Sequence, residues 1–153
     1  AKAEKGDKIA QTVLGVMYQE SNGVLKNDKE AVKWYRKAAE QGYAIAQNNL
    51  GLMYAKGDGV LEDDREAVKW FRKAADQGDA GAQFNLGLMY DNGEGVQEDY
   101  VTSYAWWNIA SANGHAFAKK NKDIIAKGLT ADQIARSQAL AKEMTTLNPK
   151  LLN

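Results

Sequence analysis

One histidine limits the chemistry that this sequence could carry out. His115 is the only histidine among the 153 residues, and there is no cysteine. A metal site built from histidines, a zinc ribbon and a thiol redox site are therefore excluded, and a hydrolase triad would depend on His115 alone. The residues 36 and 72 positions before it are Asp79 and Tyr43. Because the residue type varies at this position, we expect His115 to be a surface residue.

Acidic and glycine-rich stretches could bind calcium or a nucleotide, but their order does not fit either site. Asp58, Asp63 and Asp64 lie near glycines without the order of a calcium loop. The Gly-x-Gly pairs at 57–59 and 93–95 lack the third glycine and the preceding strand of a dinucleotide site. We interpret the aspartates as helix caps and the glycines as loop geometry. We therefore expect no catalytic residue, no metal and no cofactor.

The charges are balanced, which argues against two classes of partner. The chain has 20 basic and 20 acidic side chains, so it lacks the net positive charge that attracts nucleic acids and anionic membranes. Basic residues that recur around Lys33 and Lys69 stand beside Glu30 and Glu66, as on a solvated face of mixed charge. No apolar run approaches the ~20 residues that span a bilayer. We expect neither nucleic-acid binding nor membrane insertion.

The chain repeats itself every 36 residues. Residues 27–60 and 63–96 share 24 identities in 34 positions, a density that indicates internal duplication. A fixed period of roughly 20–50 residues is typical of stacked repeats, and 36 differs from the ~34 of tetratricopeptide units. We expect an all-α solenoid of antiparallel helix pairs.

Each repeat is predicted to contain two helices. Residues 64–77 carry apolar side chains at helical spacing. Asp63 and Glu66 have the spacing of a capping box at the start of this helix, and Gly78 follows its end. A second helix is predicted over about 80–92, and a final one over about 130–146 with Thr130 as its cap.

Two glycines inside helices indicate close packing. Gly51 and Gly87 recur at the same phase, although glycine within a helix costs roughly 0.5–1 kcal/mol relative to alanine. We infer that a neighbouring helix or an aromatic ring approaches them too closely for a Cβ. The recurring Trp34, Trp70 and Trp106 are interpreted as core residues.

The repeat divides the chain, which we expect to be one domain over 1–153. Residues 3–6 correspond to 39–42, so the chain is expected to begin on the last turn of a preceding repeat. The expected parts are a remnant at 1–7, repeats at 8–43, 44–79 and 80–115, and C-terminal capping helices at 116–153.

These residues resemble the Sel-one-like repeat family, a relative of the tetratricopeptide repeats. The resemblance covers roughly Ala3 to Lys127 and rests on three elements, which are Ala46-Gln47-x-x-Leu50-Gly51-x-x-Tyr54, the Gly-x-Gly-Val loop and Ala67-Val68-x-Trp70-Phe71-x-x-Ala74-Ala75-x-x-Gly78. It implies a right-handed superhelix whose concave surface binds protein partners, in bacterial scaffold or adaptor proteins. The disulfide-rich branch of the family carries paired cysteines in each repeat, and this chain has none.

The first helices of successive repeats usually line the concave side of such a solenoid. We therefore predict a partner-binding surface of side chains that point away from the core positions of two first helices, with the alternative that the leucines pack between neighbouring helices. The predicted residues are Ile45, Asn48, Asn49, Leu52, Lys56, Phe84, Asn85, Leu88 and Asn92.

The leading functional hypothesis is a non-enzymatic scaffold that binds a protein or peptide on this face. Two alternatives stay open, which are a penicillin-binding or β-lactamase-like activity, suggested by family analogy alone, and a fragment of a larger envelope assembly protein. We expect a monomer, with end-to-end stacking as the alternative. By the same analogy, the periplasm or secretion is favoured over the cytoplasm.

Overall fold

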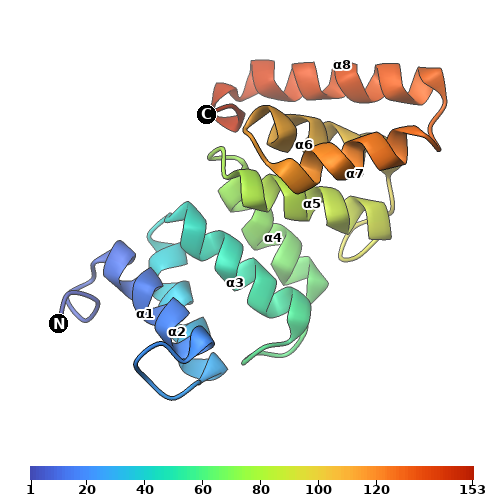
Figure 1. The fold of residues 1–153 in the computed structure, drawn as a ribbon. Coiled ribbons are helices and arrows are strands. Elements are labelled where there is room, and N and C mark those ends of the chain that lie inside the picture. The colour runs from blue at the N-terminus through green and yellow to red at the C-terminus, as the bar shows by residue number, and fades with distance from the viewer. The chain divides into compact units, whose positions relative to one another are not determined.

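The computed structural model describes all 153 residues and is entirely helical (Figure 1). Its elements are α1 (Lys8–Glu20), α2 (Asp28–Glu40), α3 (Ala44–Lys56), α4 (Asp64–Ala75), α5 (Ala80–Asn92), α6 (Tyr100–Ala112), α7 (Ala116–Ala126), α8 (Ala131–Leu147) and the short 3-10 helix η1 (Pro149–Leu151). The predicted all-α solenoid of helix pairs is confirmed.

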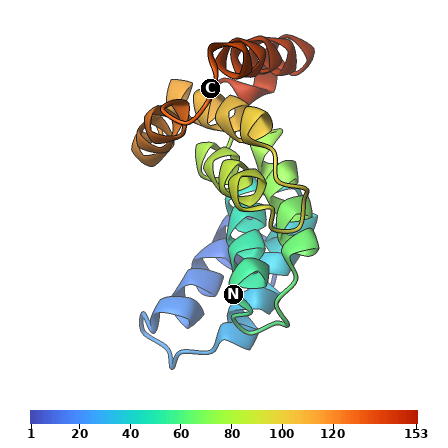
Figure 2. The same cartoon turned by 90° about the vertical axis from the view of Figure 1, so that its right-hand side faces the viewer.

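The chain forms two compact units, residues 1–73 and residues 74–153. In the N-terminal unit, α1 packs against α2, and α2 packs against α3. In the C-terminal unit, α6 packs against α5, α7 and α8 (Figure 2). Each unit is described by itself below.

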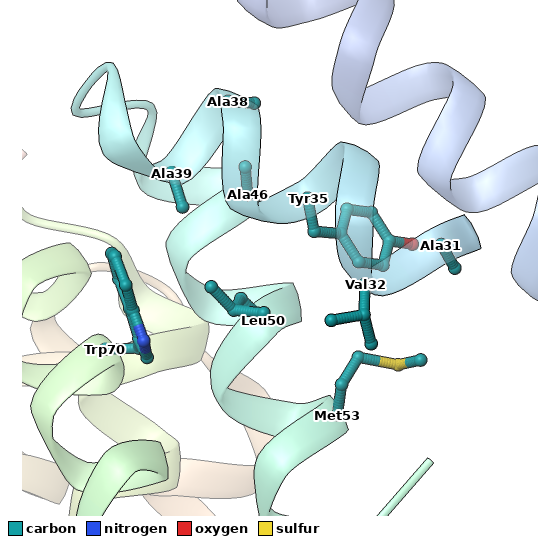
Figure 3. Close-up of a cluster of buried hydrophobic side chains, with 9 residues drawn as sticks. All are labelled: Ala31, Val32, Tyr35, Ala38, Ala39, Ala46, Leu50, Met53 and Trp70. Atoms are coloured by element: carbon teal, nitrogen blue, oxygen red, sulfur yellow. The ribbon is translucent and has the colours of Figure 1, made fainter. Parts of the chain in front are cut away.

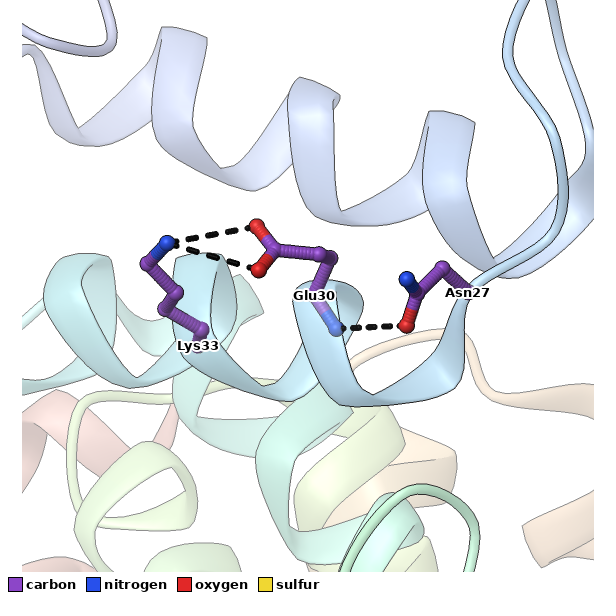
Figure 4. Close-up of polar contacts among 3 residues, drawn as sticks. All are labelled: Asn27, Glu30 and Lys33. Carbon is purple, nitrogen blue, oxygen red and sulfur yellow. Dashed lines mark hydrogen bonds and ion pairs between the residues drawn. The ribbon is translucent and has the colours of Figure 1, made fainter.

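Three helix starts have the spacing of a capping box, and the reciprocal box forms at one of them and not at the other two. The Thr130 hydroxyl accepts from the Gln133 N–H (3.1 Å), and the Gln133 side chain accepts from the Thr130 N–H (2.9 Å). At Asn27 only half of the box is present, because Glu30 turns to Lys33, 3.3 Å away (Figure 4).

Asp63 behaves in the same way as Asn27. Its carboxylate accepts from the Glu66 N–H, and Glu66 pairs with Lys69 at 3.2 Å. The backbone explains the difference from Thr130. The N–H groups of Asn27 and Asp63 already donate to the carbonyls of Tyr18 and Tyr54, so a glutamate has no free donor to reach at either cap.

The close approach predicted at the helical glycines is confirmed, and the neighbour is an aromatic ring. A Cβ added to Gly51 would lie 2.6 Å from the ring of Phe71, and one added to Gly15 would lie 2.5 Å from Tyr35. At Gly87 the indole of Trp107 is closer still. Each ring follows one of the recurring tryptophans in the sequence, and each lies too close to its glycine to leave room for a methyl group.

The recurring tryptophans are buried, as predicted. Trp34, Trp70 and Trp106 are between 2% and 8% exposed. Figure 3 shows Trp70 in the core cluster of the N-terminal unit, together with Leu50 and with Ala39 of α2.

A buried glutamine on each first helix closes the preceding turn. The side-chain amides of Gln11, Gln47 and Gln83 donate to the carbonyls eight residues earlier, at 3.0, 3.1 and 3.2 Å. The same three carbonyls also accept from the backbone N–H groups of Gly6, Gly42 and Gly78, so each glutamine adds a second hydrogen bond at its turn.

Candidate functional site

An apolar groove lies between α1 and the start of α3 in the N-terminal unit. Three large aliphatic side chains are about half exposed there, with Ile9 at 57%, Val13 at 53% and Ile45 at 48%. The hollow has a volume of about 380 Å³, and its lining residues are Ile9, Thr12, Val13, Val16, Met17, Asn22, Tyr43 and Ile45.

The predicted residues of α3 differ in how much they face solvent. Ile45 lines the groove, and Lys56 is exposed at the end of the helix. Asn48, Asn49 and Leu52 are half-buried.

Asn49 has a structural partner within its unit. Its side chain hydrogen bonds to the hydroxyl of Tyr35, which also donates to Gln19 at 2.7 Å. Burial raises the pKa of Tyr35 to about 12, with Glu20 adding to the effect and the Asn49 bond opposing it. Because Asn49 helps to hold the ring that covers Gly15, a substitution there would disturb the core as well as any surface.

Of the predicted residues of α5, Phe84 belongs to an aromatic cluster in the C-terminal unit. The ring of Phe84 stacks on His115 with centroids 4.5 Å apart, and it lies 6.4 Å from both Trp107 and Phe117. Phe117 is 66% exposed, so the cluster has an open edge.

The other predicted residues of α5 are Asn85, Leu88 and Asn92, and none of them belongs to the aromatic cluster. Leu88 packs beside Phe84 against the buried side chains of α6 and α7, which is the alternative that the sequence left open. Asn85 is half-buried and Asn92 is exposed.

His115 is half-buried rather than fully at the surface. Its Nδ1 caps α7 by accepting from the Ala118 N–H at 3.2 Å. Burial lowers the pKa of His115, and the charge of Asp79 opposes this shift. Burial also raises the pKa of Asp79, whose carboxylate caps α5 through the Ala82 N–H at 2.8 Å.

Sequence reasoning missed the α1 side of the groove, although the signal was available. Ile9, Thr12, Val13 and Val16 lie 36 residues before Ile45, Asn48, Asn49 and Leu52. Applying the repeat offset once more toward the N-terminus would have found them. The same offset carries Gly81 to Phe117, the exposed ring of the aromatic cluster.

Residues 1–153 contain neither a cluster of side chains suited to a metal ion nor a helix suited to spanning a membrane. No group of three or more histidine, cysteine, aspartate or glutamate side chains is arranged to hold a metal ion. None of the helices combines the length and the apolar character that crossing a bilayer requires.

Comparisons with known proteins agree with the fold. The family model described as Sel1 repeat matches residues 8–43, 44–79 and 80–115. A search of curated proteins found no match to the chain.

Two solved structures are similar to the chain over most of its length. One is c5321, a protective antigen of uropathogenic Escherichia coli strains with an SLR fold, at 40% identity and a TM-score of 0.89, covering 97% of this chain and 32% of that one. The other is a Sel1 repeat protein from Oxalobacter formigenes, at 41% identity and a TM-score of 0.74, covering 78% of this chain and 49% of that one. This chain thus spans about a third and about half of these two relatives. With three matched repeats, the chain belongs to the Sel1 repeat family, whose members generally act as protein-protein interaction scaffolds.

Proposed function

We propose that this protein is a non-enzymatic scaffold that binds an apolar segment of a partner protein in the groove between α1 and α3. The observation that carries the proposal is the exposure of Ile9, Val13 and Ile45 together over one hollow. Scattered exposed aliphatic residues are ordinary, whereas a contiguous apolar patch with polar surroundings marks an interaction site. Covering the exposed half of three such side chains contributes on the order of 1 kcal/mol each.

The surroundings of the groove support a peptide or helix as the partner. Asn22 is exposed where it lines the hollow and supplies hydrogen-bonding groups, whereas Thr12 is buried and donates its hydroxyl to the Lys8 carbonyl at 2.8 Å. Lys8 stands over the ring of Tyr43, with its ammonium 5.8 Å from the ring centroid. A mostly apolar hollow with a few polar groups at its edge is typical of helix-in-groove and peptide recognition.

The titratable groups of the C-terminal unit support the non-enzymatic part of the proposal. Asp79 and His115 are near enough to influence each other's pKa, yet both are engaged as helix caps. On that unit, we propose that Phe84 and Phe117 offer a second apolar contact for the same class of partner. Turnover of nitrocefin above the buffer rate would contradict a purely scaffolding role.

The groove is tested by selecting peptides from a displayed library against the full chain. Peptides that bind in the groove should be rich in spaced apolar residues and should lose at least ~10-fold in affinity with Val13→Asp, since an uncompensated carboxylate in an apolar contact costs more than 1.4 kcal/mol. The matched control is Leu25→Asp, which puts the same charge on a loop residue that is 91% exposed in the same unit. If both variants lost the same affinity for the peptides, or if Val13→Asp lost none, the groove would not be the binding site.

A further inference from the structure

The last residues of the chain are held in the C-terminal unit as a bound peptide would be. The Asn113 side chain donates to the Leu151 carbonyl (2.8 Å) and accepts from the Asn153 N–H (2.9 Å). The Gln83 side chain donates to the same Leu151 carbonyl at 2.8 Å. All of these contacts are made to the main chain of the last residues. The Asn113 carboxamide bonds both the Leu151 carbonyl and the N–H of Asn153, two residues later.

The turn between α4 and α5 completes this site. The Asn153 side chain donates to the Gly78 carbonyl (2.6 Å), and the Asn148 side chain donates to the Asp76 carbonyl (2.9 Å). The Lys150 carbonyl lies so close to Gly78 that a Cβ there would overlap it. The occupied site therefore consists of three groups, which are the turn at Gly78, the buried Gln83 and the carboxamide of Asn113 directly after α6.

The N-terminal unit contains the same three groups 72 residues earlier. Gly6, Gln11 and Gln41 correspond to Gly78, Gln83 and Asn113. The amide of Gln41 donates to the Gln11 side-chain oxygen at 2.8 Å, and the amide of Asn113 donates to that of Gln83 at 2.9 Å. The buried glutamine also makes its bond to the preceding turn in both places.

The copy in the N-terminal unit is open. A Cβ added to Gly6 would meet nothing within 4 Å. Gln41 is exposed, and the second hydrogen bond of its amide goes to the Lys37 carbonyl of its own helix at 3.2 Å. In the occupied copy, the corresponding groups hold a main-chain carbonyl instead. Rotation of the exposed Gln41 side chain would release the same donor.

We propose that Gly6, Gln11 and Gln41 form a second binding site, which takes an extended peptide segment by its main chain. The ligand offers a carbonyl to the two carboxamides and, two residues later, an N–H to the Gln41 oxygen, as residues 151 and 153 do at Asn113. Because the site hydrogen bonds to main-chain groups of the peptide, it accepts many different side chains. It is separate from the apolar groove, and it stands whether or not the groove binds a partner.

The site is tested with the acetylated peptide Asn-Pro-Lys-Leu-Leu-Asn, titrated into the full-length, ¹⁵N-labelled chain. The side-chain amide signals of Gln11 and Gln41 should shift in a saturable way. Gln41→Ala should weaken binding at least ~10-fold, the effect of losing about two hydrogen bonds. Gln41→Asn, which installs the residue of the occupied copy, should retain binding. Since Gln41 is exposed, neither change should unfold the protein.

Two controls separate this site from its competitors. A peptide N-methylated at its last residue lacks the N–H that the carboxamide oxygen accepts, and it should bind more weakly. Shifts confined to Gln83 and Asn113 would mean that the peptide exchanges with the chain's own last residues, and shifts confined to Val13 and Ile45 would mean that it enters the groove. Either result, or the absence of shifts at millimolar peptide, overturns the proposal.

Discussion

At the scale of single residues, the contact between a helical glycine and an aromatic ring leaves no room for any larger residue at the glycine position of each repeat. We predict that Gly51→Ala destabilises the protein, although alanine is the better helix former by about 1 kcal/mol. The new methyl group would lie 2.6 Å from the Phe71 ring, and overpacking of this kind costs typically 1–3 kcal/mol. Urea denaturation of the variant measures the net loss.

A double variant identifies the ring as the cause of that loss. Phe71→Leu should be destabilising alone, but combined with Gly51→Ala it should cost less than the sum of the two, because the smaller side chain makes room for the methyl group. Additive costs would mean that the methyl group meets some other neighbour.

His115 gives the stability a pH dependence whose sign follows from its lowered pKa. The folded protein holds the proton less well than the unfolded chain, whose histidine has the ordinary pKa of 6.5. The free energy of unfolding should therefore fall as the pH drops below about 7 and level off below the folded pKa. Protonation also removes the Nδ1 lone pair that accepts from the Ala118 N–H.

The Tm measured between pH 7.5 and 5 checks this expectation. His115→Asn keeps a capping oxygen without a titrating group, so it should flatten the profile in this window. Asp79 acts in the opposite direction at lower pH. Burial raises its folded pKa above the ordinary 3.8, so the unfolding free energy gains a contribution as the pH falls through that pKa.

At the scale of helices, the two kinds of cap should differ in how much their third residue contributes. Gln133 completes a reciprocal box with Thr130, whereas Glu30 pairs with the exposed Lys33 instead. We predict that Gln133→Ala lowers the unfolding free energy by about 0.5–1 kcal/mol. Glu30→Ala should cost less than about 0.5 kcal/mol, the usual value of an exposed ion pair within a helix.

Chemical denaturation of the two alanine variants tests this difference. Thr130→Ala provides the reference for loss of a whole cap, at about 1 kcal/mol. A larger loss from Glu30→Ala than from Gln133→Ala would show that the glutamate reaches the cap of α2 in solution.

At the scale of the whole molecule, stability in a repeat protein is a sum of local terms and contacts between neighbours. Leu151 is 3% exposed and anchors the last residues to the C-terminal unit. Leu151→Ala should therefore cost roughly 2–4 kcal/mol and should act locally. Hydrogen exchange should accelerate in residues 74–153 more than in residues 1–73, and equal acceleration in both units would contradict local coupling.

The sequence by itself determined the repeat, the helix pairs and most helix ends. These features depend on spacing along the chain, which sets the apolar stripe, the caps and the glycine turns. It also predicted a closely packed neighbour at Gly51 and Gly87, because a residue that is unfavourable in a helix recurs there and needs a compensating contact. One boundary was wrong by two residues, since α4 ends at Ala75 and the residues up to Gly78 form a turn.

Only the tertiary structure decided which ring covers each glycine, which first-helix side chains stay open and where the last residues bind. The sequence could not distinguish Phe71 from Trp70 as the neighbour of Gly51, because adjacent helical residues differ only in the direction they point. The repeat offset points to Ile9 and Val13 as counterparts of Ile45 and Asn49, but it could not show that both side chains remain about half exposed over one hollow. The contact of Asn153 with Gly78 joins residues 75 positions apart. Such a contact has no period or local pattern, and it exists only because α8 folds back on α6.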